Sequence, residues 1–399
     1  PKPQSPNPKP LTRKTSKIFA FKLDRSRKKT DLRGIKQGAE NVEERVRNEG
    51  TRLVQDYIRS FVRNGDQYIG RATQKNYPDG SRYEGEFQGD KRVGKGVFFY
   101  KNGDVYAGDW ANDKLNGKGT YIYAKGERYV GDLLNGQKHG YGTYLYTNGN
   151  VYEGSWANNL KQGRGNYVYF NGDSYNGDWD KGVRSGQGVF TLAGGDLYKG
   201  AFRNGVKEGP GSINYHSGAV FSGRFSGDMA TGEGELAYGA GEAFRGEFRQ
   251  SKKNGQGSYV WPDGTRLVGE FRNDFPGGAV QVRFAAGDSY EGGMNGPQKE
   301  GKGTVVYSNG DAYRGDFKND RKHGQGVYVY KATGDEYSGE WSDDNKHGTG
   351  TYRYANGDVF EGVWVAGLRS GPGRMRFADG QEQSGEFRDD PSGGPGRFI

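Results

Sequence analysis

The sequence of 399 residues contains no cysteine. This absence excludes a disulfide framework, a thiolate nucleophile and a cysteine-ligated metal, and it fits a reducing compartment. Hydrophobic residues make up only 32% of the chain, which is too little for a thick core of Leu, Ile and Val. No apolar run approaches the roughly 20 residues of a membrane-spanning helix, and no signal-peptide core is present.

Groups that could perform chemistry are scarce and periodic. There are four histidines; His139, His323 and His347 share one Lys-His-Gly position, His216 takes another, and no third ligand lies in phase with them. The stretch Gly117–Thr120 enters a strand rather than a helix, so it does not form a phosphate-binding loop. Acidic residues recur after a turn glycine, which is typical of turns rather than of a catalytic pair: Asp104, Glu127, Asp173, Asp196, Asp288, Asp311 and Asp358. The sequence predicts no catalytic residue, no cofactor and no metal site.

The abundant residues are arranged in a repeat. The chain holds 72 Gly, 28 Tyr and 21 Phe, and a Y-x-G-x-[W/F] pattern returns every 23 residues, with one interval of 24. The first residue of this pattern, the anchor, falls at Tyr83, Tyr106, Tyr129, Tyr152, Tyr175, Tyr198, Phe221, Phe244, Leu267, Tyr290, Tyr313, Tyr337, Phe360 and Gln383.

Each repeat predicts a β-hairpin. The anchor pattern alternates with period two, a polar loop follows, and G-x-G-x-[Y/F]-x-[Y/F] alternates again before a two-residue turn such as Asn102-Gly103. Alternation places the rings and the glycines on one face, so we expect glycines such as Gly94 and Gly96 to leave space for neighbouring rings. The predicted fold is all-β: an elongated, twisted, single-layer antiparallel sheet of stacked hairpins, about 14 repeats over residues 66–399. At two strands per repeat and about 4.8 Å per strand, thirteen repeats would span roughly 125 Å.

The repeats resemble MORN repeats. The resemblance rests on units such as YEGSWANNLKQGRGNYVYFNGDS (residues 152–174) and YRGDFKNDRKHGQGVYVYKATGDE (residues 313–336), and it covers more than 80% of the chain. It implies an elongated stack of hairpins. Leu267, Met294 and Val280 depart from the pattern, so loosening is expected around residues 267–296.

Two segments precede the repeats. Residues 1–37 are rich in Pro, Lys and Arg; twelve of the basic residues lie in positions 1–36 against two Asp, which leaves the rest of the chain near neutral. This composition predicts an extended basic arm, anchored by Ile18, Phe19 and Phe21, that serves in docking or in targeting. Residues 38–65 contain a predicted amphipathic helix at about 41–63, which either caps the first repeat or binds a partner.

Two surfaces are candidates for binding. A curved sheet leaves a groove on its aromatic face for a partner helix or strand, with candidate residues Tyr106, Trp110, Tyr121, Tyr123, Tyr152, Trp156, Tyr175, Trp179, Tyr313, Tyr337, Trp341 and Trp364. A basic ladder in the polar loops predicts a charged edge facing an acidic protein surface or anionic lipid, unless it only keeps that edge solvated: Arg92, Lys138, Lys161, Arg184, Lys207, Lys253, Lys299, Lys322, Lys346 and Arg369.

The resemblance implies a non-catalytic scaffold that docks protein subunits of a large assembly. MORN-repeat proteins recur in ciliary axonemes, radial spokes and other cytoskeletal assemblies, so the expected location is cytoplasmic and cytoskeletal, in a cilium or flagellum axoneme. Two alternatives remain: a phospholipid-binding membrane-contact module, and a structural subunit of an organelle-imported assembly. No nucleic acid is expected as a partner, and lengthwise pairing of two copies stays open.

Overall fold

A computed structural model describes residues 73–390. These residues form 28 β-strands and no helix, which confirms the all-β prediction for this part of the chain. Within this range no segment is a helix long and apolar enough to cross a bilayer. The described residues fall into two units, 73–229 and 230–390. The predicted arm and helix, including Ile18, Phe19 and Phe21, lie outside the described residues.

The first unit is an open antiparallel sheet in which each strand pairs with the next one along the chain. Its strands are β1 (Thr73–Asn76), β2 (Arg82–Gln88), β3 (Lys91–Phe99), β4 (Val105–Ala111), β5 (Lys114–Ile122), β6 (Arg128–Leu134), β7 (Gln137–Leu145), β8 (Val151–Ala157), β9 (Leu160–Val168), β10 (Ser174–Asp180), β11 (Val183–Thr191), β12 (Leu197–Arg203), β13 (Val206–Asn214) and β14 (Val220–Ser226).

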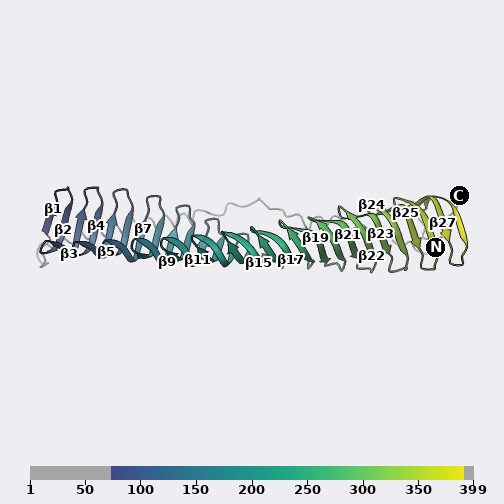
Figure 1. Cartoon of the computed structure of the whole chain (residues 1–399), viewed down its shortest axis with the longest axis horizontal. Helices are drawn as coiled ribbons and strands as arrows, with labels where there is room; N and C mark the ends of the chain where they lie inside the picture. Colours follow the sequence, from purple (N-terminus) through teal and green to yellow (C-terminus); the bar gives the residue numbers. More distant parts are fainter. Residues whose placement is uncertain (1–72, 391–399) are drawn as a thin grey trace. The chain divides into compact units, whose positions relative to one another are not determined.

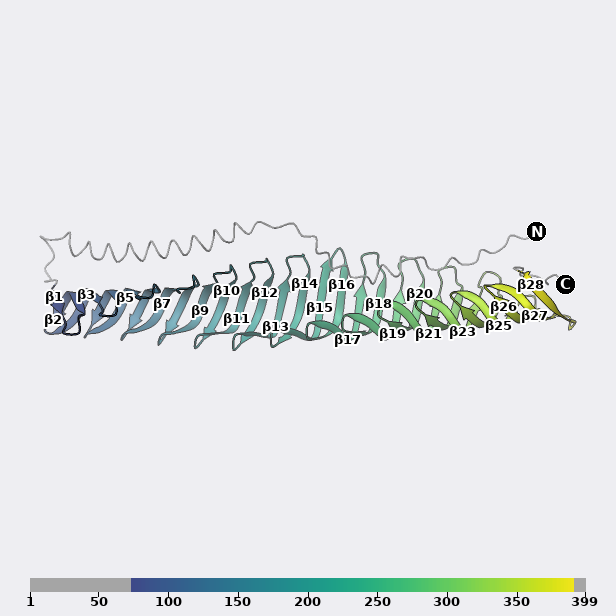
Figure 2. The ribbon, with the colours of Figure 1, turned by 90° about the horizontal axis from the view of Figure 1, so that it is seen from above.

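The second unit repeats the same plan, and Figures 1 and 2 show the strands of each unit following one another in chain order. Its strands are β15 (Met229–Gly239), β16 (Glu242–Arg249), β17 (Lys252–Val260), β18 (Arg266–Arg272), β19 (Phe275–Arg283), β20 (Ser289–Asn295), β21 (Gln298–Val306), β22 (Ala312–Lys318), β23 (Arg321–Val329), β24 (Glu336–Ser342), β25 (Asn345–Arg353), β26 (Val359–Val365), β27 (Leu368–Arg376) and β28 (Glu382–Asp390).

The connections between strands differ from the prediction. The polar loop inside a repeat is a two-residue turn: Asn112 and Asp113 join β4 to β5 with φ of 49° and 66°, the backbone that a tight right-twisted hairpin requires. The Asn-Gly pair at 102–103 instead lies in a five-residue loop, 100–104, whose first and last residues share a 2.9 Å backbone hydrogen bond. The tight turn therefore lies inside each repeat rather than between repeats.

The two glycines of G-x-G have separate roles. Gly94 lies at a bulge opposite Glu86 with φ of 58°, and a Cβ there would point at the Glu86 carboxylate. Gly96 is extended, and a Cβ there would overlap the Tyr83 ring. The expectation that both glycines make space for rings is wrong for Gly94, because the bulge, not a ring, requires glycine at that position.

Aromatic rings interlock from one repeat to the next. The Tyr106 ring lies edge-to-face against Trp110, with centroids 5.4 Å apart, and its hydroxyl donates to the Asp109 carbonyl oxygen at 2.9 Å. Trp110 also meets Tyr83 of the preceding repeat at 5.3 Å, and its indole N–H donates to the Gly96 carbonyl oxygen at 3.2 Å. Each such ring pair contributes about 0.5–1.5 kcal/mol beyond its buried area, so ring contacts between repeats build the core that a single layer otherwise lacks.

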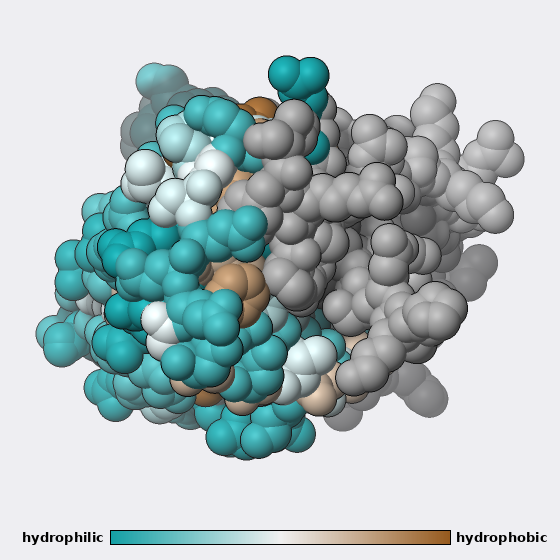
Figure 3. Space-filling model, turned by 90° about the vertical axis from the view of Figure 1, so that its right-hand side faces the viewer, coloured by the Kyte–Doolittle hydropathy of each residue, from teal (hydrophilic) through white to brown (hydrophobic). Residues whose placement is uncertain are grey.

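The departures from the pattern change the packing but not the pairing. Leu267 and Val280 are 0% and 3% exposed, and β18, β19 and β20 keep antiparallel pairing through this region. The loosening expected at residues 267–296 is absent from the strand register. Outside the core, most exposed side chains are polar, and the face drawn in Figure 3 is largely hydrophilic with small separate apolar spots.

Candidate functional site

The sheet of each unit has two faces. The aromatic face carries the anchors, the Trp or Phe four residues later and the Tyr pair of the second strand. The back face carries the residues between them. Of the twelve aromatic residues predicted to contact a partner, ten are buried, at most 5% exposed, and only Tyr121 and Tyr123 are half-buried. The rings are therefore occupied in packing between repeats.

The basic ladder lies on the aromatic face and not at an exposed edge. Lys161 is representative: its Nζ is 4.2 Å from the Trp179 ring centroid and 4.6 Å from that of Tyr167. Lys253, Lys299, Lys322 and Arg369 are at most 7% exposed and the other six members are half-buried. The prediction that these residues line an exposed charged edge is wrong, because they pack against the rings of the aromatic face.

Strand pairing explains this position. Each ladder residue is the second residue after the tight turn and pairs with the residue four positions after the anchor of its own repeat. This partner is usually Trp or Phe, as in the pairs of Lys161 with Trp156 and of Lys346 with Trp341. It is Leu133 for Lys138 and Met294 for Lys299. A cation above ring faces is attracted by their negative π-clouds, by about 0.5–2 kcal/mol. In the second repeat Leu115 takes the same place, paired with Trp110 and 9% exposed. The ladder is thus a packing position that accepts a cation or an apolar side chain.

Burial shifts the ionisation of this face. Removal from water lowers the pKa of Lys161, Lys253, Lys322 and Lys346 to about 8. Burial also raises the pKa of the ring hydroxyls, to about 12 for Tyr198. The ring faces oppose the shift of the lysines because they stabilise the charged form.

Stability should therefore pass through a maximum at alkaline pH. Unfolded Lys titrates near 10.4, so above about pH 8 the unfolded chain binds more protons than the folded one, and stability rises with pH. Above about pH 10 unfolded Tyr loses protons that the buried Tyr hydroxyls retain, and stability falls. Urea midpoints at pH 7, 9 and 11.5 should be highest at pH 9; a midpoint that falls steadily from pH 7 would contradict this assignment.

Carboxylates at the five-residue loops join neighbouring repeats, a role beyond the turn formation that their spacing predicts. Asp104 accepts from the Tyr121 hydroxyl at 2.9 Å and from the Ala124 N–H at 2.8 Å, both in the following repeat. Asp311 makes the same pair of contacts with Tyr328 and Lys331. The signal in the sequence was the return of an acidic residue 21 positions after most of the anchors.

On the back face, charged pairs also connect repeats. Lys95 lies 2.6 Å from Asp109, and Lys302 lies 2.7 Å from Asp316 in the same relation. These pairs are solvent-exposed, so each stabilises the sheet by about 1 kcal/mol at most. In both pairs the lysine directly precedes the second glycine of G-x-G, Gly96 or Gly303.

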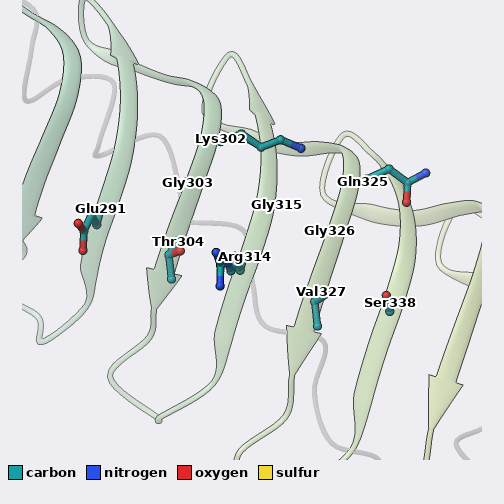
Figure 4. A pocket seen from close by; sticks show the side chains of 10 residues that line it. All are labelled: Glu291, Lys302, Gly303, Thr304, Arg314, Gly315, Gln325, Gly326, Val327 and Ser338. Atoms are coloured by element: carbon teal, nitrogen blue, oxygen red, sulfur yellow. The ribbon is translucent and has the colours of Figure 1, made fainter.

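A shallow groove lies on the back face of the second unit. Its floor is the backbone of Gly303, Gly315 and Gly326, and Figure 4 shows Lys302 and Gln325 on one side of these glycines and a row of short or polar side chains on the other. The hollow has a volume of about 730 Å³ and continues into a second of about 530 Å³ that shares Gln325 and Ser338. We call the two together the back-face groove; its further lining residues are Glu291, Thr304, Arg314, Val327, Gly339, Thr349, Gly350, Thr351, Glu361, Gly362, Val363 and Pro372.

The histidines remain at their repeat positions. His323 pairs across the hairpin with Asp316, and His347 with Glu340. Within residues 73–390 no three His, Asp or Glu side chains converge as metal ligands would.

The described geometry defines a class: a repeat protein built of hairpins in an open single-layer sheet. The model of the MORN repeat matches eleven segments, 83–105, 106–128, 129–151, 152–174, 175–197, 198–220, 244–266, 290–312, 313–332, 337–359 and 360–382. The chain therefore belongs to the MORN-repeat family. The anchors Phe221, Leu267 and Gln383 begin segments outside these matches, although their strands pair in the same way. MORN repeats are found in scaffolds that bind proteins or membranes.

Other comparisons are weak. No curated protein matches the sequence. Among solved structures, the TCP10 domain of Danio rerio CPAP is 12% identical and aligns 56% of this chain with 95% of its own, at a TM-score of 0.28. The TCP domain of Drosophila melanogaster SAS-4, solved with a proline-rich motif of Ana2, is 14% identical over 57% of this chain and 98% of its own, at a TM-score of 0.21. TM-scores this low support no inference about the present chain.

Proposed function

We propose that this protein is a non-catalytic scaffold that docks protein subunits along the back face of its second unit. The observation that carries the proposal is the back-face groove, which is open, has exposed backbone at its floor and is bordered by alternating charges such as Glu291 and Arg314. Polar borders with a small apolar contribution suit a partner segment held by hydrogen bonds and charge complementarity.

The aromatic face supports this assignment by elimination. Its rings and its ladder of cations contact one another across repeats, so they offer little free surface to a partner. The membrane-contact alternative is weakened for the same reason, because the cations of the ladder pack against rings and are buried or half-buried instead of projecting from an edge. We propose an axonemal or related cytoskeletal assembly as the location, which rests on the resemblance alone; an organelle-imported assembly would use the same docking face.

The test compares two arginine substitutions at the same repeat position in the same unit. Ser338 lies between the two hollows of the groove, whereas Val268 lies outside it and is 54% exposed. In cells of the source organism, the tagged chain should stay with the detergent-resistant cytoskeletal fraction. Ser338→Arg should release most of the tagged chain from this fraction, because blocking one central contact of an interface costs about 2 kcal/mol or more. Val268→Arg should leave the chain in the fraction.

Two results would overturn the proposal. The first is recovery of the unaltered chain in the detergent-soluble membrane fraction. The second is retention of Ser338→Arg equal to that of Val268→Arg. Equal thermal melting of both variants is the control that excludes unfolding as the cause of release.

A further inference from the structure

An apolar patch lies on the back face of the first unit, where the repeat pattern otherwise places polar residues. One cross-strand row runs through Val97, Ala107, Thr120 and Val130, each paired with the next across β3 to β6. A second row beside it runs through Phe99, Val105, Ile122, Leu145, Val151 and Val168 on β3, β4, β5, β7, β8 and β9. We call these ten residues the back-face patch.

The patch is more buried than its place in the sheet explains. Ala107 and Val268 occupy the same repeat position, one residue after an anchor. Ala107 is 2% exposed, whereas Val268 is 54% exposed. Val97 and Leu145 are 1% and 4% exposed, whereas Val306, at the repeat position of Leu145, is 42% exposed. The described strands form one layer at both places, so the strands themselves do not account for the difference in exposure.

We infer that residues 41–63 of the same chain cover this patch as an amphipathic helix lying along the back face, rather than capping the end of the array. The apolar stripe of this segment contains Val42, Val46, Leu53, Val54, Tyr57, Ile58, Phe61 and Val62. Twenty-three helical residues extend about 35 Å, and the seven strands β3 to β9 extend about 29 Å. The helix is therefore long enough to cover the patch, and its apolar stripe would pack against the apolar side chains of the patch.

The connection also fits. Residues 64–72 separate the segment from β1, and nine residues can span up to about 30 Å, more than the roughly 10 Å between β1 and β3. The helix would run from β9 back to β3. This patch is then unavailable to partners in the folded chain, which leaves protein docking to the back-face groove of the second unit.

Thiol labelling tests the inference, because the chain has no cysteine of its own. Ala107→Cys reports on the patch, and Val268→Cys is the matched control at the same repeat position. In the full-length chain Ala107→Cys should react with a maleimide at least about tenfold more slowly than Val268→Cys, since only the opened state exposes a covered thiol. Adding Leu53→Asp and Ile58→Asp should bring the two rates within about twofold, with unchanged strand content by circular dichroism.

Three results would overturn it. Equal labelling of both cysteines in the full-length chain would mean that the patch is open. Slow labelling of Ala107→Cys that persists with Leu53→Asp and Ile58→Asp would mean that something else covers it. A rate that rises on dilution would assign the cover to a second copy of the chain instead of to the same one.

Discussion

Gly188→Ala should lower the free energy of unfolding by about 3 kcal/mol, at the upper end of the range for overpacking a core. The added Cβ would lie 2.6 Å from the Tyr175 hydroxyl oxygen and would overlap the edge of its ring. The ring cannot move aside, because it is 0% exposed and held between Trp179 and Phe202 at 5.3 and 5.0 Å. Chemical denaturation of the purified chain measures the loss.

The same repeat supplies the control. A Cβ added at Gly194 would have no atom within 4 Å, and the φ of Gly194 is not positive. Gly194→Ala should therefore change stability by less than about 1 kcal/mol, with a stabilising sign if any. Equal losses for the two variants would mean that glycine acts through backbone freedom and not through the space it leaves for the ring.

The chain also shows how the clash can be relieved. Where the anchor is Leu267 instead of Tyr, the residue opposite Gly269 is Val280 instead of Gly, and both side chains are buried. Combining Gly188→Val with Tyr175→Leu should therefore recover at least half of the stability that Gly188→Val loses alone, a coupling that a double-mutant cycle measures. Additive losses would contradict it.

Lys322→Glu should destabilise the second unit by about 3–5 kcal/mol. Lys322 is 7% exposed and its Nζ lies 4.6 Å from the Trp341 ring centroid and 4.8 Å from that of Tyr328. A carboxylate there would meet negative ring faces and the charge of Asp344, which now acts on the lysine.

Lys322→Leu is the matched substitution. Leu115 already occupies this repeat position in the second repeat, buried beside Trp110, so Lys322→Leu should stay within about 1 kcal/mol of the unaltered chain. A loss as large as that of Lys322→Glu would show that the charge itself is required, and the ladder would then be more than a packing position.

The sequence was sufficient for the strands and for the side of the sheet on which the rings lie, because period-two alternation with a 23-residue repeat leaves one consistent arrangement. Tyr106, Trp110 and Tyr121 share a face as predicted. What was not predicted is the place of the cations. The pattern predicts a longer polar loop that includes Asn112 and Asp113. In the structure these two residues, with positive φ, are the whole turn. The residues at the ladder position therefore belong to strands, and their side chains lie on the aromatic face.

The back-face groove was not predicted either. Its floor consists of glycine backbone, and its side chains, such as Thr304, Val327 and Ser338, differ from repeat to repeat. A repeat pattern contains only the residues that recur, and the recurring residues of this chain build the sheet. Residues that distinguish one repeat from another, and so could select a partner, carry no periodic signal.

The central claim is that the recurring residues of the repeat build the sheet and do not bind. The most direct measurement is retention of a chain carrying both Lys161→Leu and Lys322→Leu, one in each unit, in the detergent-resistant fraction, together with its co-sedimentation with vesicles rich in phosphatidylserine. We predict that this variant equals the unaltered chain in retention and in whatever vesicle binding the unaltered chain shows. A variant that falls below the unaltered chain in either measurement, with the fold intact by circular dichroism, would contradict the claim and make the cation ladder a binding surface.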